Sequence, residues 1–512
     1  MNGEHTNRLE AILIVGLFIC TLALCLYRLE IYPASWFDEG LSLQVSKNLL
    51  LYGKYGMMSL PEGLREFDPA IQAGPTILLP VALAFRVAGI GILQARLVMV
   101  FYTLLALTVF YWLVREICGR KVAFLASLLL IFTFDHEFTS FVFMGRQVLA
   151  EVPALAFFWS GTLFWFRAWK SPRRSALVCP GLLWGLAMLT KVQFVLMLTV
   201  ALILFWLFDR ISGQKLQIRH VLVPVLVGGG CILMWYGYQV LTMDFTDFWQ
   251  QIMELGSAGG MHLLHFSPRR TMSAVFQLLD SSLILFGLPG MLYTVGSNLQ
   301  NGEETEYHQV FLVVFTVVWL GWYAFLSIGW MRYAFVPAAM STIFSARLLG
   351  DSWDWAGQSR QVPGHWLPLD PGQVAIGGVI VMLLLSGLLP MAKQIVQSPD
   401  NGLQELAQYL NTHIPADVVI ESWEWEVDSL TDHTYHHPPY EITNAFTEHV
   451  WYGTPVPPDI YDPLAFHPTY LIAGPFAKWT GIYSRDTLEQ RCTLIESIGE
   501  YDLYEVNTDG EK

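Results

Sequence analysis

The chain has 512 residues, of which 54% are hydrophobic and 14% are charged, and its formal net charge is −14. Soluble domains carry about 25% charged residues, so this composition and the long apolar runs exclude a soluble protein and predict a polytopic membrane protein. Nucleic acid is excluded as a partner, because proteins that bind it carry basic stripes. The six cysteines show no paired or C-x-x-C spacing, which argues against disulfides and cysteine-bound metal.

Twelve apolar runs follow one another along the chain, and eleven of them are predicted to cross the membrane. The eleven cover residues 11–27, 97–115, 122–135, 148–168, 176–190, 192–208, 221–241, 274–296, 309–328, 333–349 and 373–392. The remaining run, 76–93, contains Pro80, Arg86 and Gly89, which suit a helix on the membrane surface better than a span.

Positive charges decide the orientation of these spans. Basic residues cluster at 115–121, 167–174 and 210–219, and such loops stay in the cytoplasm. All three clusters lie inside only if residues 76–93 do not cross. We therefore expect a multi-pass protein of the cell (plasma) membrane with a cytoplasmic N-terminus and an extracytoplasmic C-terminus.

Residues 30–96 then form one long outer loop with two surface helices. The first helix is predicted over 38–52, where Leu41, Val45, Leu49 and Tyr52 share one face and Gln44 lies off it. Such an apolar stripe suits a helix that lies in the plane of the membrane interface.

The composition changes after the last apolar run, which predicts two domains. Residues 1–392 are expected to form the transmembrane domain, and 393–512 a small extracytoplasmic α/β domain. In the second, the pattern predicts a helix over 403–412, strands over 418–420 and 469–473, and a hairpin over 492–506 around Gly499.

Asp38 and Glu39 are the strongest candidates for catalysis. They are adjacent carboxylates, placed by the topology at the outer edge of the membrane within Trp36-Phe37-Asp38-Glu39-Gly40. A carboxylate there can deprotonate a hydroxyl that attacks a lipid-borne substrate. The structural alternative is a helix start at Ser35-x-x-Asp38, in which the acidic side chain satisfies backbone N–H groups.

Further ionisable side chains lie at the outer ends of predicted spans, where charge is costly and marks candidate sites. A second acidic loop comprises Asp135, His136 and Glu137, with Glu151 nearby; the cations are Arg146, Lys191, Arg269, Arg270 and Arg332, which precedes Tyr333. These cations and Tyr333 are candidates for binding the donor phosphate or the substrate. The structural alternatives are an Arg146–Glu151 ion pair, a solvated loop at 135–137, and contacts of Lys191, Arg332 and the 269–270 pair with lipid headgroups.

Over residues 10–350 the chain resembles the GT-C glycosyltransferases, and most closely the family-39 group of protein O-mannosyltransferases and the aminoarabinose transferase of lipid A. The resemblance is carried by Trp36-Phe37-Asp38-Glu39, the paired surface helices, Met144-Gly145-Arg146 with Glu151-Val152-Pro153, Leu189-Thr190-Lys191, and Arg332-Tyr333 with Pro337. The second surface helix of such proteins often begins with two prolines, where this chain has Gly74-Pro75.

The resemblance implies a GT-C fold and an inverting transferase that uses a polyprenyl-phosphate sugar. It implies that Asp38 is the primary catalytic carboxylate with Glu39 beside it, and that Arg146, Lys191 and Arg332 contact the donor. The acceptor is a hydroxyl of a glycan, a lipid or a protein. A divalent metal is compatible with the carboxylates, although no spacing requires one. The rivals are a flippase or transporter of lipid-linked sugars and an oligosaccharide-transferring enzyme of the same architecture.

Overall fold

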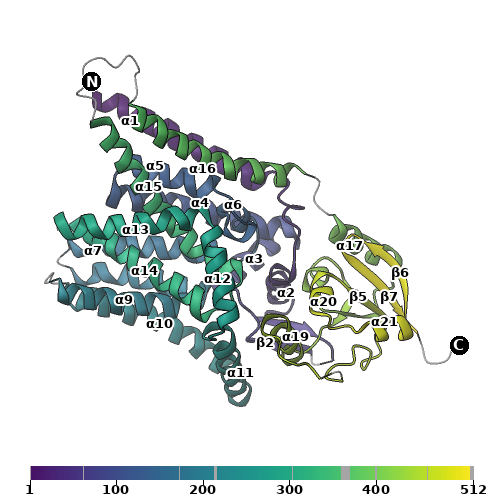
Figure 1. Ribbon diagram of the computed structural model, residues 1–512. Coiled ribbons are helices and arrows are strands. Elements are labelled where there is room, and N and C mark those ends of the chain that lie inside the picture. The colour runs from purple at the N-terminus through teal and green to yellow at the C-terminus, as the bar shows by residue number, and fades with distance from the viewer. Residues whose placement is uncertain are drawn as a thin grey trace.

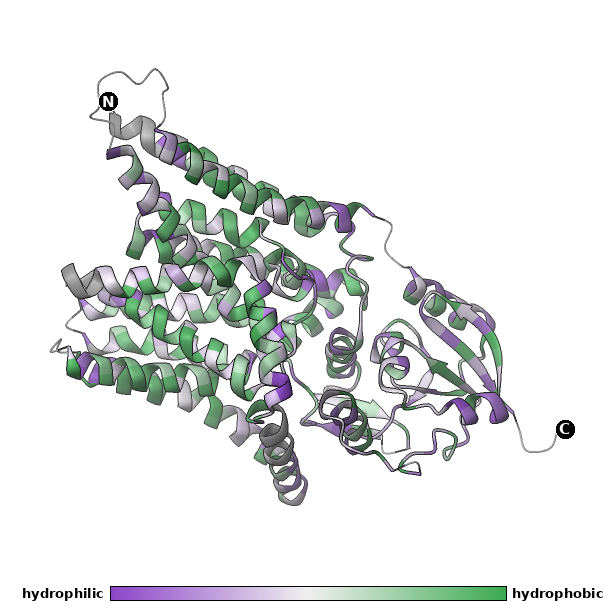
Figure 2. Cartoon of the chain, viewed as in Figure 1, coloured by the Kyte–Doolittle hydropathy of each residue, from purple (hydrophilic) through white to green (hydrophobic). Residues whose placement is uncertain are grey.

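The computed structural model describes residues 2–61, 63–171, 173–212, 216–301, 304–358, 370–397, 401–457 and 459–507. It consists of a large helical bundle and a smaller α/β domain at one end of that bundle (Figure 1). Hydrophobic residues line the bundle helices, whereas the C-terminal domain is more hydrophilic (Figure 2). The N-terminus lies at the end of the bundle away from the C-terminal domain (Figure 1).

Each apolar run predicted to span the membrane lies in helical structure. The bundle helices are α1 (Asn2–Leu26), α4 (Ile92–Cys118), α5 (Arg120–Phe132), α7 (Glu151–Trp169), α8 (Val178–Thr190), α9 (Gln193–Ile211), α10 (Arg219–Thr242), α13 (Ser282–Asn301), α14 (Glu304–Leu326), α15 (Phe335–Gln358) and α16 (Pro371–Val396). The chain is therefore a multi-pass helical membrane protein.

The individual helices differ in how well they satisfy the length of a span. Five are long and apolar enough to cross by themselves, or up to six if the bent pair α12 (Pro268–Asp280) and α13 counts as one. Others are shorter than the eleven predicted spans imply: α5 and α8 have 13 residues each, whereas a bilayer core needs about 20. The run at 274–296 is not one straight helix, because α12 and α13 meet at 86°.

Both predicted helices of the first outer loop are present, but the first is oriented differently from the prediction. α2 (Phe37–Tyr52) and α3 (Pro75–Ala88) flank the hairpin β1 (Gly56–Ser59) and β2 (Gly63–Glu66). In α2 the polar Gln44 and Asn48 are buried along with Leu41 and Val45, while Tyr52 is exposed. The Asn48 amide donates to the Gly56 carbonyl at 3.0 Å. α2 is therefore enclosed by protein between the bundle and the C-terminal domain (Figure 1).

The C-terminal domain contains one five-stranded sheet. Its strands are β3 (Val419–Ser422), β4 (Thr434–His436), β5 (Tyr470–Ala473), β6 (Cys492–Ile498) and β7 (Tyr501–Val506), in the order β4-β3-β5-β7-β6. β4, β3 and β5 are parallel, and β5, β7 and β6 are antiparallel. The helices are α17 (Gly402–His413), α18 (Trp425–Asp428), α19 (Tyr440–Tyr452), α20 (Pro475–Thr480) and α21 (Arg485–Arg491).

The sequence located α17, β3, β5 and the β6–β7 hairpin. It missed β4, α18, α20 and α21, and also α19, which has 13 residues. β4 has only three residues and α18 only four, too few for a periodic pattern to stand out. The remaining segments of the bundle are α6 (Phe141–Met144), α11 (Phe245–Leu263), η1 (Glu137–Thr139), η2 (Arg174–Leu177) and η3 (Met331–Ala334).

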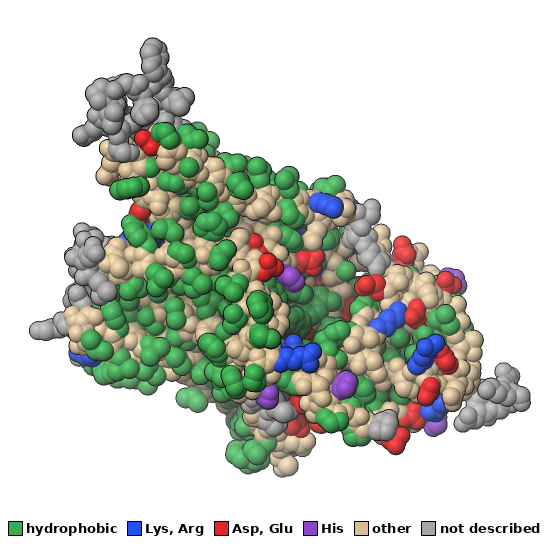
Figure 3. Space-filling model, viewed as in Figure 1, with side chains coloured by type: hydrophobic (Ala, Val, Ile, Leu, Met, Phe, Trp, Pro, Cys, Tyr) green, Lys and Arg blue, Asp and Glu red, His purple; other side chains and the backbone are tan. Residues whose placement is uncertain are grey.

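The two parts of the molecule share a hydrophobic core. One cluster of buried residues fills the bundle, and a second joins Leu41 and Val45 of α2 to Trp423, Trp425 and Leu471 of the C-terminal domain. α16 ends at Val396 and α17 begins at Gly402; the predicted division at 392/393 stays a prediction. Charged side chains gather over the C-terminal domain, whereas the bundle surface is hydrophobic (Figure 3).

Candidate active site

A cavity of about 580 Å³ lies where the bundle, the first outer loop and the C-terminal domain meet. Its walls come from α2, the β1–β2 hairpin, the turn between α8 and α9, α10, α11, η3 and the sheet domain. Three of the predicted site residues, Asp38, Lys191 and Tyr333, line it. The volume is within the range of small-molecule sites, about 300–1,000 Å³.

The start of α2 brings Asp38 to this cavity. Trp36 is the N-cap residue and has an extended backbone, and its side chain makes no capping hydrogen bond. The Ser35 hydroxyl is buried without a hydrogen-bond partner, so the alternative capping box is not formed. Asp38 and Glu39 both fall in the first helical turn, where the helix dipole favours negative charge.

Two glycines allow the close packing around this segment. A Cβ on Gly40 would lie 2.2 Å from the backbone nitrogen of Glu426, so only glycine lets α2 approach α18 this closely. Likewise a Cβ on Gly74 would lie 1.6 Å from the Leu189 carbonyl oxygen at the end of α8. Related proteins often have two prolines where this chain has Gly74-Pro75. The close approach of α8 is the steric reason for the glycine at position 74.

Asp38 belongs to a buried cluster of four charges. Arg332 of η3 donates from Nη1 to the Asp38 carboxylate and from Nε to Glu151 Oε1 at 2.5 Å. Lys191 Nζ donates to the same Glu151 oxygen at 2.7 Å. All four side chains are at least nine-tenths buried. Two carboxylates and two cations thus balance one another. Asp38 and Lys191 line the cavity, whereas Arg332 and Glu151 do not.

Aromatic rings and burial complete the surroundings of this charge cluster. The Arg332 guanidinium lies 5.8 Å from the centre of the Trp36 ring, and Lys191 Nζ lies 5.5 Å from that of Tyr333. Burial raises the pKa of Asp38 above its ordinary value, while the positive charge of Arg332 opposes that shift. A carboxylate with a raised pKa is a better proton acceptor once ionised.

Glu39 does not line the cavity, although it is adjacent to Asp38. Its carboxylate is held by Arg96 of α4, from Nε at 2.9 Å and from Nη2 at 2.5 Å, and it accepts the Val148 backbone N–H at 3.0 Å. Both side chains of the pair are fully buried. Arg96 also donates to the Leu29 carbonyl at 2.8 Å. The structure therefore gives Glu39 a role in joining α2 to α4, not one in contact with substrate.

Comparisons with known proteins agree with this architecture. Residues 72–235, less than half of the chain, match the family model described as dolichyl-phosphate-mannose-protein mannosyltransferase. No curated protein sequence matches the chain. The structure resembles ArnT from Cupriavidus metallidurans in the apo state, with a TM-score of 0.62 and 12% identity over 98% of both chains.

Two further solved structures share the arrangement. ArnT bound to undecaprenyl phosphate has a TM-score of 0.61 and 12% identity, over 97% of this chain and 98% of ArnT. The Archaeoglobus fulgidus oligosaccharyltransferase tethered to an acceptor peptide has a TM-score of 0.57 and 12% identity, over 96% of this chain and 74% of that one. The fold is that of the GT-C glycosyltransferases. The predicted resemblance is confirmed, and the family model and the fold together indicate a glycosyltransferase.

Within this GT-C fold, Arg146 lies away from the cavity, and its hydrogen-bond partners are backbone carbonyls. Its guanidinium donates to the backbone carbonyls of Leu24, Tyr27 and Tyr32. The bond to Tyr27 is 2.6 Å long, and the shorter of the two bonds to Tyr32 is 2.8 Å long. Arg146 thereby closes the end of α1 and the turn that follows. The alternative ion pair with Glu151 is not among the contacts of Arg146 in the described part of the chain. Arg146 does not line the cavity, and its contact with the donor stays a prediction.

The second acidic loop is likewise directed away from the cavity. Asp135 accepts hydrogen bonds from the Ser281 and Ser282 hydroxyls at 2.9 and 2.5 Å, so it secures the bend between α12 and α13. His136 caps η1 through its Nδ1, and Glu137 lies in the same short helix. Only Glu151 of the predicted acidic group joins Asp38.

The two adjacent arginines of α12 also separate from the cluster. Arg269 is exposed. Arg270 donates from Nε to the Trp451 carbonyl at 2.6 Å and so connects α12 to α19 of the C-terminal domain. Neither residue lines the cavity.

The residues at the site do not make a ligand set for a divalent metal. Arg332 bridges the Asp38 and Glu151 carboxylates, and the described residues include no group of three or more His, Cys, Asp or Glu side chains that could hold an ion. A hard cation prefers several oxygen ligands.

Sequence reasoning missed Arg96, the partner of Glu39. Arg96 directly precedes the apolar run 97–115 on the side assigned to the exterior, where arginine is unfavourable under the positive-inside rule. That departure is the signal by which Arg96 could have been found.

Proposed function

We propose that this protein is a membrane glycosyltransferase that moves a sugar from a polyprenyl-phosphate donor to a hydroxyl acceptor. The matching family model is described by a dolichyl-phosphate sugar, and the GT-C fold is shared with ArnT bound to undecaprenyl phosphate and with AglB in complex with dolichol-phosphate. The observation that carries the proposal is the position of Asp38 and Lys191 on the wall of one cavity, connected through Arg332 and Glu151.

Each side chain of the cluster has a distinct part in the proposed reaction. Asp38 accepts the proton of the acceptor hydroxyl. Lys191 and Arg332 bind the phosphate, because ammonium and guanidinium groups form short, charge-assisted hydrogen bonds with phosphate oxygens. Glu151 positions both cations and cancels part of their charge when the donor is absent. Tyr333 packs beside Lys191 and holds it in place.

The reaction is a single displacement with inversion. The acceptor oxygen attacks the anomeric carbon as its proton passes to Asp38, and a new glycosidic bond forms. The bond between the anomeric carbon and the phosphate oxygen breaks, and its electron pair leaves with the polyprenyl phosphate. Stabilising the departing phosphate in a buried site is where the cations contribute most.

The donor chain reaches the cavity from the membrane. Part of the cavity wall is apolar and comes from α9, α10 and α11, with Val195, Ile232, Trp235 and Ile252 among its residues. α10 is a membrane span by length and composition, with only 11% of that window buried inside the protein. A prenyl chain can therefore lie against α10 while its phosphate reaches Lys191.

The cavity is extracytoplasmic in the proposed orientation. At the N-terminal end of the bundle, Glu10 pairs with Arg115 at 3.2 Å and with Arg120 at 2.9 Å. This basic end is the cytoplasmic one under the positive-inside rule. The C-terminal domain then lies outside the membrane on the same basis, and we propose the plasma membrane as the location of the protein.

The test compares two matched carboxylate variants of the reconstituted protein. Asp38→Asn keeps the size of the side chain but removes the base, and it should lower sugar transfer by about 10²–10⁴-fold. Asp135→Asn changes an outer-loop carboxylate that does not line the cavity, and it should leave transfer near the wild-type rate. Transfer is measured as the release of polyprenyl phosphate from a radiolabelled donor with cell-envelope extract as the acceptor source.

The same experiment distinguishes a glycosyltransferase from a transporter of the donor. An Asp38→Asn protein as active as Asp135→Asn would remove the assigned base. Movement of the intact donor across vesicles without acceptor, and without release of polyprenyl phosphate, would favour a flippase instead.

A further inference from the structure

We propose that helix α19 forms the acceptor subsite and that the acceptor is a glycan without negative charge. This inference rests on the proposed function and names the substrate class of the same cavity. It draws on three features of the cavity wall: a stripe on α19, the aromatic rings around it, and the charges around Tyr440.

α19 turns one face toward the cavity and the opposite face toward protein. Residues at i, i+4, i+7 and i+11 share a helix face. On α19 these are Tyr440, Asn444, Thr447 and Trp451, and all four line the cavity. Ile442 and Phe446, on the opposite face, pack against the hydrophobic cluster of the C-terminal domain. α19 is therefore packed on one side while the other presents aromatic, amide and hydroxyl groups to a ligand.

Aromatic rings beside α19 provide flat surfaces. The Trp425 and His437 rings stack with centres 3.6 Å apart and planes 19° apart, and both residues line the cavity. The centre of the Trp451 ring lies 6.3 Å from that of Trp330, which also lines the cavity. A sugar ring has an apolar C–H face and a rim of polar hydroxyls. Aromatic rings can pack against the C–H face, while nearby amide and hydroxyl groups form hydrogen bonds with the rim.

Strand β4 is not open to an extended peptide at this wall. Peptides commonly bind by adding a strand to an exposed sheet edge. The edge strand near the cavity is β4, and the first outer loop already covers it: the Leu60 N–H donates to the Tyr435 carbonyl at 3.1 Å. The Ser59 hydroxyl accepts the His437 N–H at 2.8 Å. The sheet domain thus presents side chains to the cavity, which favours a glycan over a peptide.

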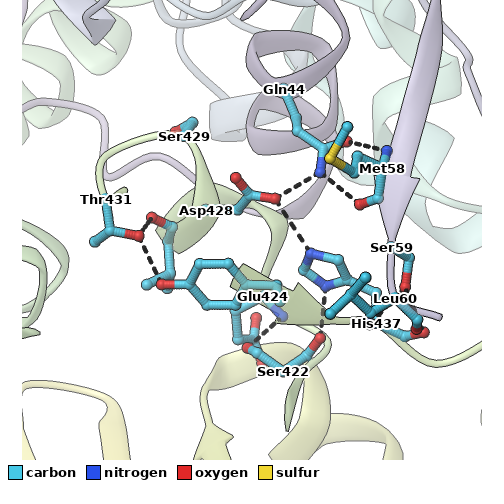
Figure 4. A network of polar contacts seen from close by, with 12 residues as sticks. Gln44, Met58, Ser59, Leu60, Ser422, Glu424, Asp428, Ser429, Thr431 and His437 are labelled. Atoms are coloured by element: carbon cyan, nitrogen blue, oxygen red, sulfur yellow. Dashed lines mark hydrogen bonds and ion pairs between the residues drawn. The ribbon is translucent and has the colours of Figure 1, made fainter. Parts of the chain in front are cut away.

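The same contacts fix the position of the C-terminal domain over the site (Figure 4). Gln44 of α2 donates to Asp428 of α18 at 2.5 Å and to the Met58 carbonyl at 2.9 Å. Lys47 donates to the Asp428 and Thr431 carbonyls at 3.1 and 3.0 Å. A domain held at several points makes a preformed subsite, which reduces the entropic cost of binding.

The ionisable side chains around Tyr440 carry a net negative charge. Arg65 of β2 pairs with Asp68 at 3.1 Å and with Glu254 of α11, and Glu441 of α19 adds a third carboxylate to their surroundings. Burial and the surrounding carboxylates raise the pKa of Tyr440 to about 12. A phosphorylated or acidic acceptor would be repelled there, while a neutral or amino-bearing sugar would not.

The experiment separates acceptor use from donor chemistry. Full-length protein is reconstituted with sugar-radiolabelled polyprenyl-phosphate donor and is offered neutral glycan, anionic glycolipid and protein fractions of the cell envelope. We expect the label in the neutral glycan fraction. Tyr440→Phe and Asn444→Leu should each lower transfer by about tenfold, the effect of losing one hydrogen bond to the acceptor, while donor binding is unchanged. His449→Gln changes an exposed residue of α19 that does not line the cavity, so this variant should match wild type.

The possible results separate this inference from the proposed function. Label in protein or in the anionic glycolipid overturns the assigned acceptor class. Tyr440→Phe and Asn444→Leu variants that both transfer at the wild-type rate overturn the assignment to α19. A wild-type protein that releases no sugar with any fraction overturns the proposed function itself and this subsite with it.

Discussion

Asp38 and Glu39 are adjacent in sequence, are both carboxylates and are both paired with arginine, yet their surroundings differ. Asp38 faces the cavity and shares Arg332 with Glu151, which also binds Lys191. Glu39 is fully buried and is bound by Arg96 of α4 and the Val148 N–H. Successive helical residues point about 100° apart, so one turn of α2 sends one carboxylate to the cavity and the other to the core.

Charge balance separates the reactive pair from the structural one. The cluster around Asp38 contains two cations and a second carboxylate. A phosphate can therefore replace one carboxylate as the partner of these cations, and no buried charge is left unpaired. At Glu39 the guanidinium of Arg96 has one carboxylate partner, and its remaining bond goes to the Leu29 carbonyl. Removal of either member of that pair leaves an uncompensated charge.

The largest effect on stability is expected from Glu39→Gln. This change leaves the charge of Arg96 buried, which costs about 3–5 kcal/mol of unfolding free energy. Thermal unfolding in detergent should show a markedly lower midpoint. The Asp38→Asn protein should unfold at nearly the wild-type temperature, because Arg332 still pairs with Glu151. A double variant, Glu39→Gln with Arg96→Met, should recover part of the loss, since no buried charge remains. A stable but inactive Glu39→Gln protein would contradict the comparison.

A second prediction concerns the cation that lines the cavity. Lys191→Gln removes a phosphate ligand and should lower the rate of sugar transfer by about 10²-fold, the loss typical of one charged group at a developing anion. Lys54→Gln is the matched control, because Lys54 pairs with Glu66 on the surface at 2.7 Å and does not line the cavity. Single-turnover release of polyprenyl phosphate measures both. Equal loss in the two variants would indicate a general effect of lysine removal and not a phosphate contact.

The sequence located the helices well but could not assign the partners of the charged residues. Apolar runs and Pro80, Arg86 and Gly89 are local signals, and they placed the bundle helices and α3. The pairing of Glu39 with Arg96 joins residues 57 positions apart and depends on how α2 packs on α4. In the same way Arg146 was expected at the donor because it is polar at a helix end, and it binds carbonyls that are distant in sequence.

The orientation of α2 shows the same limit. Its apolar stripe predicted a helix with one face in the membrane interface. The C-terminal domain covers the other faces, so Gln44 and Asn48 are buried with partners from β1 and α18. A pattern within one helix carries no information about a domain that begins more than 300 residues later in the chain.

A third prediction tests whether the position of α2 against α18 sets the geometry of Asp38. Gly40→Ala places a methyl group 2.2 Å from the Glu426 nitrogen, so the backbone must move, at a cost of about 1–3 kcal/mol. Sugar transfer and thermal stability should fall together. Gly237→Ala is the control, because no atom lies within 4 Å of its Cβ position in α10. A Gly40→Ala protein with full activity would show that α2 can shift without affecting Asp38.

The smallest expected effect is on the pH dependence of transfer, and it distinguishes Asp38 from Glu39 directly. Asp38 must be ionised to accept a proton, and its ionised fraction falls as the pH drops through its pKa. Because burial raises the pKa of Asp38, activity should decline on the acid side at a pH above about 3.9, the ordinary value for aspartate. The charges around Asp38 set the direction of further shifts: Arg332 lowers the pKa of Asp38, and Glu151 raises it.

Arg332→Gln should therefore move the acid limb, the part of the pH profile where activity declines on the acid side, to higher pH. Glu151→Gln should move it to lower pH, whatever either change does to the maximal rate. Rates of polyprenyl phosphate release measured across the acid range would show these opposite shifts. An acid limb that stays in place in both variants would mean that the titrating group is not Asp38.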